Sequence, residues 1–151
     1  MKSILFVCTG NICRSPTADA ILRHLVKEEG LDITVDSAGT HAYHVGEQPD
    51  DRTIKTAQSQ GIEMSDLRAR KLQKSDFDKF DCLIAMDNGH LQAMKQLAKQ
   101  HHQNKLHLFL DFTTEHKGKD VPDPYYGTQK DFNHVYSIVF KGCKNILNSI
   151  T

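Results

Sequence analysis

The sequence lacks an excess of either charge, a long apolar run and a closely spaced cysteine pair. Its 151 residues carry 19 basic and 19 acidic side chains, so we expect no general attraction to nucleic acid or to an anionic membrane. No apolar stretch approaches the roughly 20 residues of a membrane span, which argues against membrane insertion. The chain starts without a charged leader and cleavage site, and its four cysteines form no C-x-x-C motif. We therefore expect a protein of the reducing cytoplasm, with secretion that needs no classical signal as the open alternative.

Short apolar runs alternate with amphipathic segments along the whole chain. The runs predict strands over residues 3–7, 33–37, 81–86 and 106–112, and the amphipathic segments predict helices over 16–29, 51–60, 89–100 and 131–150. Asp87 is the predicted N-cap of the helix over 89–100. Strands that alternate with helices indicate an α/β fold with a parallel sheet. We expect a single domain over residues 1–151, a three-layer αβα arrangement with a four-stranded parallel sheet of order 2-1-3-4 and helices on both faces.

The loop of residues 8–15, called here the Cys8 loop, joins the first predicted strand to the first helix. Backbone N–H groups of a loop that feeds a helix can bind an anion, and Gly10 can adopt backbone angles closed to other residues. Arg14 offers a planar fork that suits two phosphate oxygens. The same positive field favours the thiolate of Cys8, which makes it a candidate nucleophile, and Ser15 either bonds this thiolate or caps the helix. A nucleotide P-loop is excluded, because the loop has no Gly-Lys-Ser/Thr sequence.

Asp123 is the candidate proton donor for such a nucleophile. It stands between Pro122 and Pro124, whose fixed backbone angles hold it in a stiff segment, and Tyr125 and Tyr126 can form walls for a flat substrate. A solvent-facing turn is the alternative interpretation of this segment. In a parallel sheet, ligands bind beyond the carboxyl ends of the strands, so we expect the Cys8 loop, residues 37–43, Asp87 and residues 122–126 to meet at one edge.

Residues 8–16 together with 123–127 resemble the low-molecular-weight protein-tyrosine phosphatases. The resemblance extends to residues 36–40, 45–46 and 69–70, and so covers nearly the whole chain. It implies Cys8 as the nucleophile of a phosphocysteine intermediate, Arg14 as the phosphate clamp and Asp123 as general acid and then base. It implies no metal and no cofactor. The implied partners are phosphotyrosine-containing proteins and a cognate tyrosine kinase that opposes the enzyme.

The resemblance also assigns supporting roles around the phosphate. Asn11 and Ser37 are implied to brace the Cys8 loop, and Ser15 to assist the thiolate. The residues expected to bind phosphate or support the loop are Thr9, Gly10, Asn11, Ile12, Cys13, Ser15 and Ser37. The residues expected to wall the substrate cleft are Thr9, Tyr43, Tyr125 and Tyr126, with loop filling as the alternative role of Tyr43.

Two residues depart from the family pattern. Thr9 replaces the bulky apolar residue that usually follows the nucleophile, which predicts a smaller and more polar cleft wall. Leu67 occupies the region where many members place a histidine before the Ala-Arg pair, so the support of Asn11 is expected to differ.

Three rival functions remain open. With Thr9, the Cys8 loop begins Cys-Thr-Gly-Asn, which also resembles the protein-arginine phosphatases. Those members typically carry threonine where this chain has Ile12, and the two tyrosines favour phosphotyrosine. A thiol-dependent arsenate reductase needs a redox pair, whereas the helix predicted after Cys82 supplies no second cysteine. A phosphate-binding module without catalysis leaves Asp123 unexplained.

Two further signals are weaker. The pair His101-His102 has no cysteine or carboxylate near it in the sequence, so a solvated face is favoured over a metal site. Cys13 either packs in the core or captures oxidised Cys8 as a reversible disulfide.

Overall fold

The computed structural model describes residues 2–151 and contains the predicted parallel sheet. In sheet order its strands are β2 (Thr34–Gly39), β1 (Ser3–Cys8), β3 (Cys82–Ala85) and β4 (Leu106–Leu108). Every pair is parallel, which confirms the predicted order 2-1-3-4. β1 therefore lies in the middle of the sheet, and its last residue, Cys8, is paired with Gly39 of β2.

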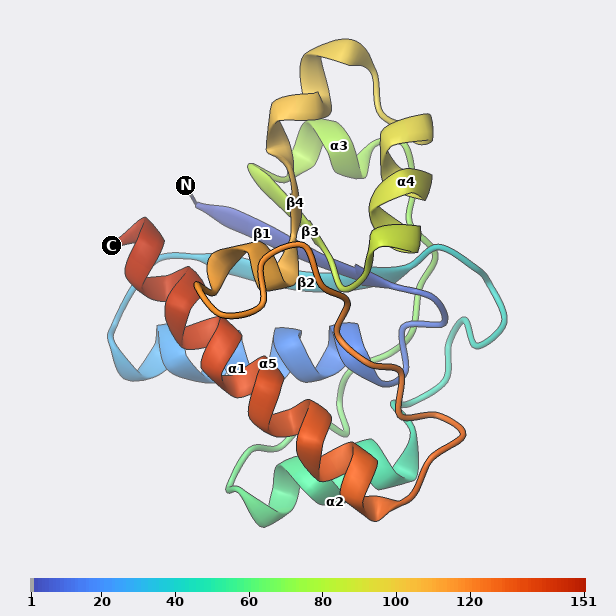
Figure 1. Cartoon of the computed structure of the whole chain (residues 1–151), viewed down its shortest axis with the longest axis vertical. Helices are drawn as coiled ribbons and strands as arrows, with labels where there is room; N and C mark the ends of the chain where they lie inside the picture. Colours follow the sequence, from blue (N-terminus) through green and yellow to red (C-terminus); the bar gives the residue numbers. More distant parts are fainter. Residues whose placement is uncertain (1) are drawn as a thin grey trace.

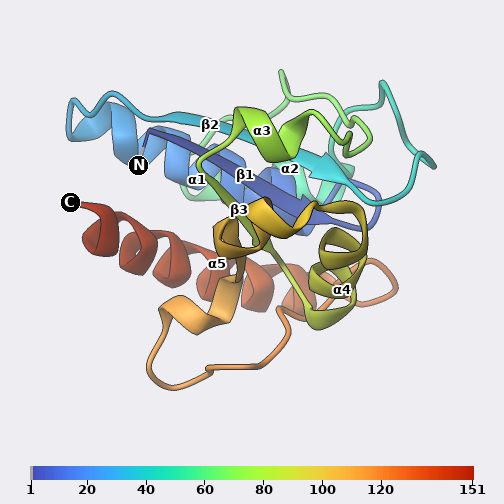
Figure 2. The ribbon, with the colours of Figure 1, turned by 90° about the horizontal axis from the view of Figure 1, so that it is seen from above.

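Helices cover both faces of the sheet, as predicted. The helices are α1 (Arg14–Glu28), α2 (Asp51–Ser59), α3 (Asp76–Lys79), α4 (Asn88–Leu97) and α5 (Gln129–Ile150). α1, α2 and α5 lie on one side of the strands, and α3 and α4 on the other (Figure 1). Figure 2 shows α1 and α5 running alongside the strands, and these two helices pack against each other.

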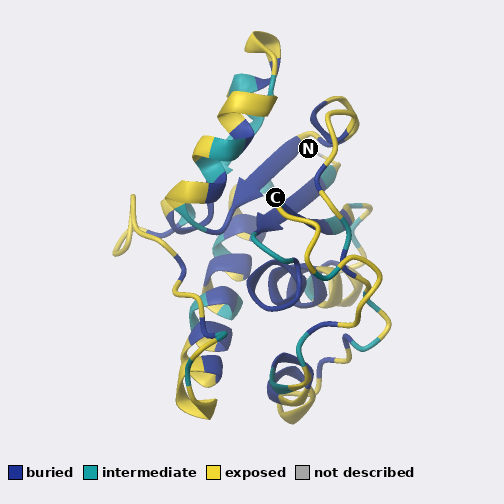
Figure 3. Ribbon diagram, turned by 90° about the vertical axis from the view of Figure 1, so that its right-hand side faces the viewer, coloured by how far each residue is buried: buried dark blue, intermediate teal, exposed yellow. Residues whose placement is uncertain are grey.

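The alternation of side chains along β1 divides the core into two parts. Ile4 and Phe6 belong to the cluster that contains the apolar residues of α1 and α5, whereas Leu5 and Val7 pack with α3 and α4. Because both faces are covered, the whole of β1 from Ile4 onward is buried, and the strands are among the most buried parts of the chain (Figure 3).

The fourth strand is shorter than the predicted 106–112. β4 ends at Leu108, and the chain turns into a 3-10 helix, η2 (Phe109–Phe112). Phe109 is fully buried, its ring centroid lies 6.1 Å from that of Phe6, and it fills the space left by Gly142 of α5. An unbroken apolar run cannot reveal that its middle residue leaves the sheet to pack between β1 and α5.

Helix ends differ from the prediction for local reasons. α1 begins at Arg14, two residues before the predicted start at 16. α5 begins at Gln129 because Thr128 and Asp131 form a capping box. α4 ends at Leu97 and is followed by a 3-10 helix, η1 (Gln100–Lys105), while Asp87 is the N-cap of α4 as predicted. The short helix α3 was not predicted.

The long connection after η2 is hydrogen-bonded to the sheet edge and to α4. The Asp120 carboxylate accepts a hydrogen bond from the backbone N–H of Asn88 at 2.8 Å, and the N–H of Val121 donates to the carbonyl of Met86 at 2.9 Å. The connection is therefore fixed to the carboxyl end of β3, and it leads residues 121–127, called here the acid loop, to the Cys8 loop. Within residues 2–151, no helix has the length and apolarity needed to cross a bilayer.

Candidate active site

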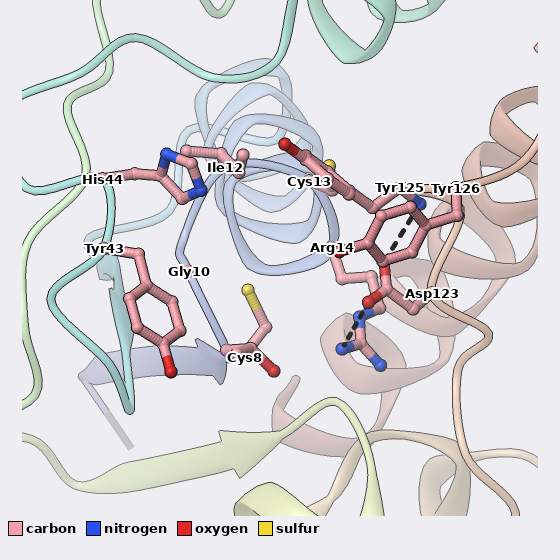
Figure 4. Close-up of a pocket in the computed structure, with 11 residues that line it drawn as sticks. Cys8, Gly10, Ile12, Cys13, Arg14, Tyr43, His44, Asp123, Tyr125 and Tyr126 are labelled. Carbon is pink, nitrogen blue, oxygen red and sulfur yellow. Dashed lines mark hydrogen bonds and ion pairs between the residues drawn. The ribbon is translucent and has the colours of Figure 1, made fainter.

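The Cys8 thiol lies at the base of a cleft with a volume of about 300 Å³. The cleft is lined by Cys8, Thr9, Gly10, Ile12, Cys13, Arg14, Tyr43, His44, Asp123, Tyr125 and Tyr126. The Cys8 sulfur points into the space between Tyr43 and Tyr125 (Figure 4). The fold thus brings the Cys8 loop and the acid loop, more than a hundred residues apart in the sequence, into one site.

A hydrogen-bonded chain supports the Cys8 sulfur from beneath. Cys8 Sγ lies 2.9 Å from Ser15 Oγ, and Ser15 Oγ accepts a hydrogen bond from Asn11 Nδ2 at 2.8 Å. Because Asn11 occupies a lone pair of the Ser15 oxygen, the hydroxyl proton is available to the sulfur. Ser15 therefore bonds Cys8, and the alternative, a helix-capping role, is wrong: the N-cap of α1 is Cys13.

Asn11 holds the shape of the Cys8 loop. Its Nδ2 also donates to Ser37 Oγ at 2.9 Å, and its Oδ1 accepts from the backbone N–H of Arg70 at 3.0 Å. Asn11 has a φ of 59°, and among residues 2–151 it is the one non-glycine residue with a positive φ. The support of Asn11 thus comes from the backbone of Arg70, while Leu67, the departure from the family pattern, packs against the main apolar cluster.

The expectation that Gly10 supplies the unusual backbone angle of the loop is wrong. Gly10 is absent from the positive-φ residues of the described chain, and this conformation falls on Asn11. A Cβ atom at Gly10 would instead lie 2.9 Å from Cδ2 of His44. Glycine at this position therefore leaves room for the His44 ring, which a larger residue would displace.

Arg14 is buried and fixed by two acceptors. Its Nη1 donates to Asp87 Oδ2 at 2.8 Å and to the carbonyl oxygen of Val121 at 2.9 Å. Burial opposes ionisation of Asp87, but the hydrogen bonds from the His90 backbone N–H and from Arg14, together with the charge of Arg14, hold its pKa below the usual range. Asp87 was expected at this edge of the sheet, but its bond to Arg14 was not predicted.

Asp123 faces Arg14 from the acid loop. Its Oδ2 lies 3.7 Å from Arg14 Nη2, and its Oδ1 accepts a hydrogen bond from the backbone N–H of Tyr125 at 3.1 Å. The Asp123 side chain is 51% exposed, so it can exchange protons with solvent and with a bound molecule. This places a carboxyl group at the mouth of the cleft that holds Cys8.

Aromatic rings line the cleft on two sides. Tyr43 is 71% exposed and stacks on His41 with a centroid distance of 5.0 Å. Tyr125 and Tyr126 meet edge to face at 4.9 Å, and Arg52 donates to the carbonyl of Tyr125 at 2.9 Å. The two walls form a slot that suits a planar ring.

The other cysteines differ from Cys8 in their surroundings. Burial raises the pKa of Cys82 to about 12, and burial together with the nearby charge of Asp50 raises that of Cys13 to about 12. Cys82 and Cys143 are fully buried and lie outside the cleft, whereas Cys13 lines it. Cys13 is therefore the one described cysteine that shares the cleft with Cys8.

The histidine pair forms the expected solvated face only in part, because His101 is exposed and His102 is not. His102 is buried, and its Nε2 lies 2.6 Å from Oδ1 of Asp78 in α3. Asp78, His101 and His102 could each offer one ligand atom to a metal ion, with these atoms within 4.8 Å of one another. The hydrogen bond to Asp78 accounts for Nε2 of the buried imidazole but leaves Nδ1 without a partner, and none of the three residues lines the cleft.

A thiol in an anion-binding loop, with an arginine beside it and a carboxyl group opposite, is the arrangement of the cysteine-dependent phosphatases. The comparisons with known proteins agree with this class. A family model described as "Low molecular weight phosphotyrosine protein phosphatase" matches residues 3–151. The protein of that name from Schizosaccharomyces pombe is 42% identical over 150 residues, which cover 97% of this chain and 96% of the relative.

Solved structures give the same result. The crystal structure of a protein tyrosine phosphatase from Entamoeba histolytica, with Hepes in the active site, has a TM-score of 0.94 and 37% identity, covering 99% of this chain and 97% of that one. The structure of YfkJ from Bacillus subtilis has a TM-score of 0.93 and 38% identity, with 99% and 94% covered. This chain belongs to the low molecular weight phosphotyrosine protein phosphatase family.

Proposed function

We propose that this protein hydrolyses phosphotyrosine in proteins through a covalent phosphocysteine intermediate. One observation carries the proposal: the Cys8 thiol, the Arg14 guanidinium and the Asp123 carboxyl group converge on one cleft. Each of these groups has a separate task in phosphate transfer, and the cleft has the tyrosine walls that an aryl ester requires.

In the first step the Cys8 thiolate attacks phosphorus. The sulfur–phosphorus bond forms as the bond from phosphorus to the tyrosine oxygen breaks, and Asp123 gives its proton to the leaving phenolate. Arg14 and the backbone N–H groups of the Cys8 loop bind the phosphoryl oxygens. The bonds from Arg14 to Asp87 and Val121 keep the guanidinium oriented before substrate arrives.

In the second step water attacks the phosphocysteine. The ionised Asp123 takes a proton from this water, the sulfur–phosphorus bond breaks, and Cys8 leaves as a thiolate. The Ser15 hydroxyl, 2.9 Å from the sulfur, stabilises the departing charge. Inorganic phosphate is released, and Asp123 is protonated again for the next cycle.

We assign the enzyme to the reducing cytoplasm, where the nucleophile stays reduced. The four cysteines of the described chain are all free thiols, and a thiolate enzyme loses activity on oxidation. Its substrates are phosphotyrosine-containing proteins, and its functional counterpart is a tyrosine kinase that forms them.

Thr9 supports a second candidate function, hydrolysis of phosphoarginine, because a threonine after the nucleophile is also found in the loops of the protein-arginine phosphatases. Ile12 and the tyrosine walls favour phosphotyrosine instead. Arsenate reduction is less well supported, because Cys82 is buried in β3 and lies outside the cleft.

A side-by-side assay separates these functions. We would measure kcat/KM for a phosphotyrosine peptide and for the matched phosphoarginine peptide, and arsenate consumption with a thiol reductant. Cys8→Ser, assayed in parallel, gives the background of each reaction. We expect the phosphotyrosine peptide to be the preferred substrate, and faster turnover of phosphoarginine or arsenate would overturn the proposal.

A further inference from the structure

Thr9 follows the nucleophile and lines the cleft, but its hydroxyl is bound by a residue outside the cleft. Thr9 Oγ1 lies 2.7 Å from Nε2 of His90, in the first turn of α4. His90 is 5% exposed and is not part of the cleft lining. The hydroxyl of Thr9 is therefore bonded to a buried residue behind the cleft wall.

His90 is anchored by the carboxylate that also holds Arg14. Its backbone N–H donates to Asp87 Oδ1 at 2.9 Å, and Asp87 Oδ2 accepts from Arg14. Thr9 and Arg14, at opposite ends of the Cys8 loop, are thus both tied to the start of α4. The position of the Thr9 side chain depends on this connection as well as on its own backbone.

The imidazole of His90 is in a state that suits this bond. Burial, together with the charge of Arg14, lowers the pKa of His90 to about 4 although Asp87 opposes the shift, so the ring is neutral near pH 7. Nδ1 lies 3.1 Å from Asp87 Oδ1, off the line of a good hydrogen bond. The negative charge of this carboxylate favours the tautomer that carries its proton on Nδ1, even without an aligned hydrogen bond. Nε2 then has the lone pair that accepts the Thr9 hydroxyl.

Threonine carries one hydroxyl and one methyl group on Cβ. With the hydroxyl bonded to His90, the methyl group is the substituent of Cβ that Thr9 has left to present to the cleft, which Thr9 lines. We propose that His90 is a positioning residue that withholds the Thr9 hydroxyl from the substrate, so that this wall is apolar and selects aryl phosphate esters. The inference rests on the proposed function and deepens it. With its hydroxyl bonded to His90, Thr9 favours phosphotyrosine, as Ile12 and the tyrosines do.

Loss of His90 tests the proposal through substrate selectivity. In His90→Leu the released hydroxyl can accept hydrogen bonds from the N–H groups of phosphoarginine. We expect the ratio of kcat/KM for a phosphotyrosine peptide to kcat/KM for the phosphoarginine peptide to fall by about tenfold, the usual effect of one changed contact in a pocket. His90→Gln, whose side chain can still bond the hydroxyl, should keep a ratio near that of the wild type.

The double variant Thr9→Val/His90→Leu distinguishes positioning from a general structural effect. Valine removes the hydroxyl but keeps the branched shape, so selectivity should return to within about threefold of wild type. A double variant that stays as unselective as His90→Leu would overturn the proposal. If His90→Leu does not fold, Thr9→Val alone decides, because its ratio should stay within about threefold even if both rates fall, and a tenfold change contradicts the proposal.

The wild-type enzyme separates this inference from the function on which it rests. A wild type without activity on the phosphotyrosine peptide refutes the proposed function. A wild type that prefers this peptide, with variants that fail the pattern above, refutes the role of His90 alone.

Discussion

The two sides of the cleft differ in how firmly they are built. On the Cys8 side, the side chains that carry charge or hold the loop are buried: Cys8 is 3% exposed, Asn11 2% and Arg14 4%. On the acid-loop side, the Asp123 side chain is 51% exposed and Tyr126 is 94% exposed. The Cys8 loop is held by bonds to β2, α4 and the segment before α3, whereas Asp123 bonds to its own loop and approaches Arg14 at 3.7 Å.

The difference follows from what each side has to recognise. The phosphoryl group is the same in every substrate, so its site can be fixed in advance and made complementary to a developing charge. The peptide around the phosphotyrosine varies from one substrate to the next, and an exposed acid loop beside the tyrosine wall can adapt to it. The following predictions test this division of tasks.

The largest effect is expected on the buried side. Cys8→Ser should abolish turnover, because a serine hydroxyl in this loop is not ionised at neutral pH. Phosphate or vanadate should still bind, since Arg14 and the backbone N–H groups are unchanged. Steady-state assays and calorimetry measure the two properties separately. Continued hydrolysis would refute the nucleophile, and lost binding would show that the site is not fixed without the thiol.

Loss of the exposed acid should be severe but incomplete. Asp123→Ala should slow hydrolysis by ~100-fold or more for esters with poor leaving groups, the usual worth of general acid catalysis. Esters of acidic phenols should lose less, because they leave without a proton. Rates for a series of aryl phosphates measure this dependence, with Asp123→Asn as the control of matched size. An unchanged rate would move the acid role to another residue.

Asn11 tests the rigidity of the buried side. Asn11→Ala leaves Ser37 Oγ, Ser15 Oγ and the Arg70 N–H without their partner, which should cost about 1–3 kcal/mol of unfolding free energy. Activity should fall by roughly tenfold or more as the loop loses its shape. The measurements are urea denaturation and kcat/KM.

Asn11→Gly is the matched control, because it removes the same bonds but accepts a φ of 59° without strain. It should be less damaging than Asn11→Ala by about 1 kcal/mol. Equal stabilities would mean that the side chain alone matters.

Oxidation should distinguish the cysteines of the two environments. A sulfenic acid on Cys8 can condense with the Cys13 thiol to give a disulfide and water, which protects the nucleophile from further oxidation. Dithiothreitol should then restore the peroxide-treated wild type and the control Cys82→Ala, but not Cys13→Ala. Equal recovery of activity in all three proteins would refute the predicted Cys8–Cys13 disulfide.

The smallest effect on activity concerns the helix that begins at the Cys8 loop, where the expected change is in stability. Burial raises the pKa of Asp19 in α1 to about 6 although Arg23 opposes the shift. The folded pKa exceeds the unfolded one, so stability is full below pH 4 and falls as the pH rises through 6, on the order of 1.4 kcal/mol per pH unit. Urea unfolding of the wild type and of Asp19→Asn between pH 4 and 7 measures this. A difference in stability that stays constant with pH would contradict the assignment.

The sequence predicts the parts of the fold and site that depend on neighbouring residues. β1, the Cys8 loop and the stiff Pro-Asp-Pro segment all have local patterns, so the sheet order and the meeting of Cys8 with Asp123 agree with expectation. The Asp87 cap of α4 was predicted on the same grounds.

The parts that were missed depend on register and on packing. The bonds from Arg14 to Val121 and from Thr9 to His90 join residues 107 and 81 positions apart, and no pattern within either segment indicates its partner. From the sequence alone, Thr9 predicts a polar cleft wall, because nothing in the sequence shows that its hydroxyl is bonded to His90. Phe109 leaves the sheet because Gly142 provides space for its ring, which a uniform apolar run cannot show.

Val121 gives the acid loop a fixed origin. Its N–H is bonded to Met86 of the sheet and its carbonyl to Arg14, so a single residue sets the distance between the phosphate clamp and the acid two positions later. The chain that precedes this anchor is largely exposed between residues 114 and 119. The length of the segment 114–119 therefore does not determine the position of Asp123. Insertions in this segment can add new contacts for protein substrates while Asp123 keeps its place.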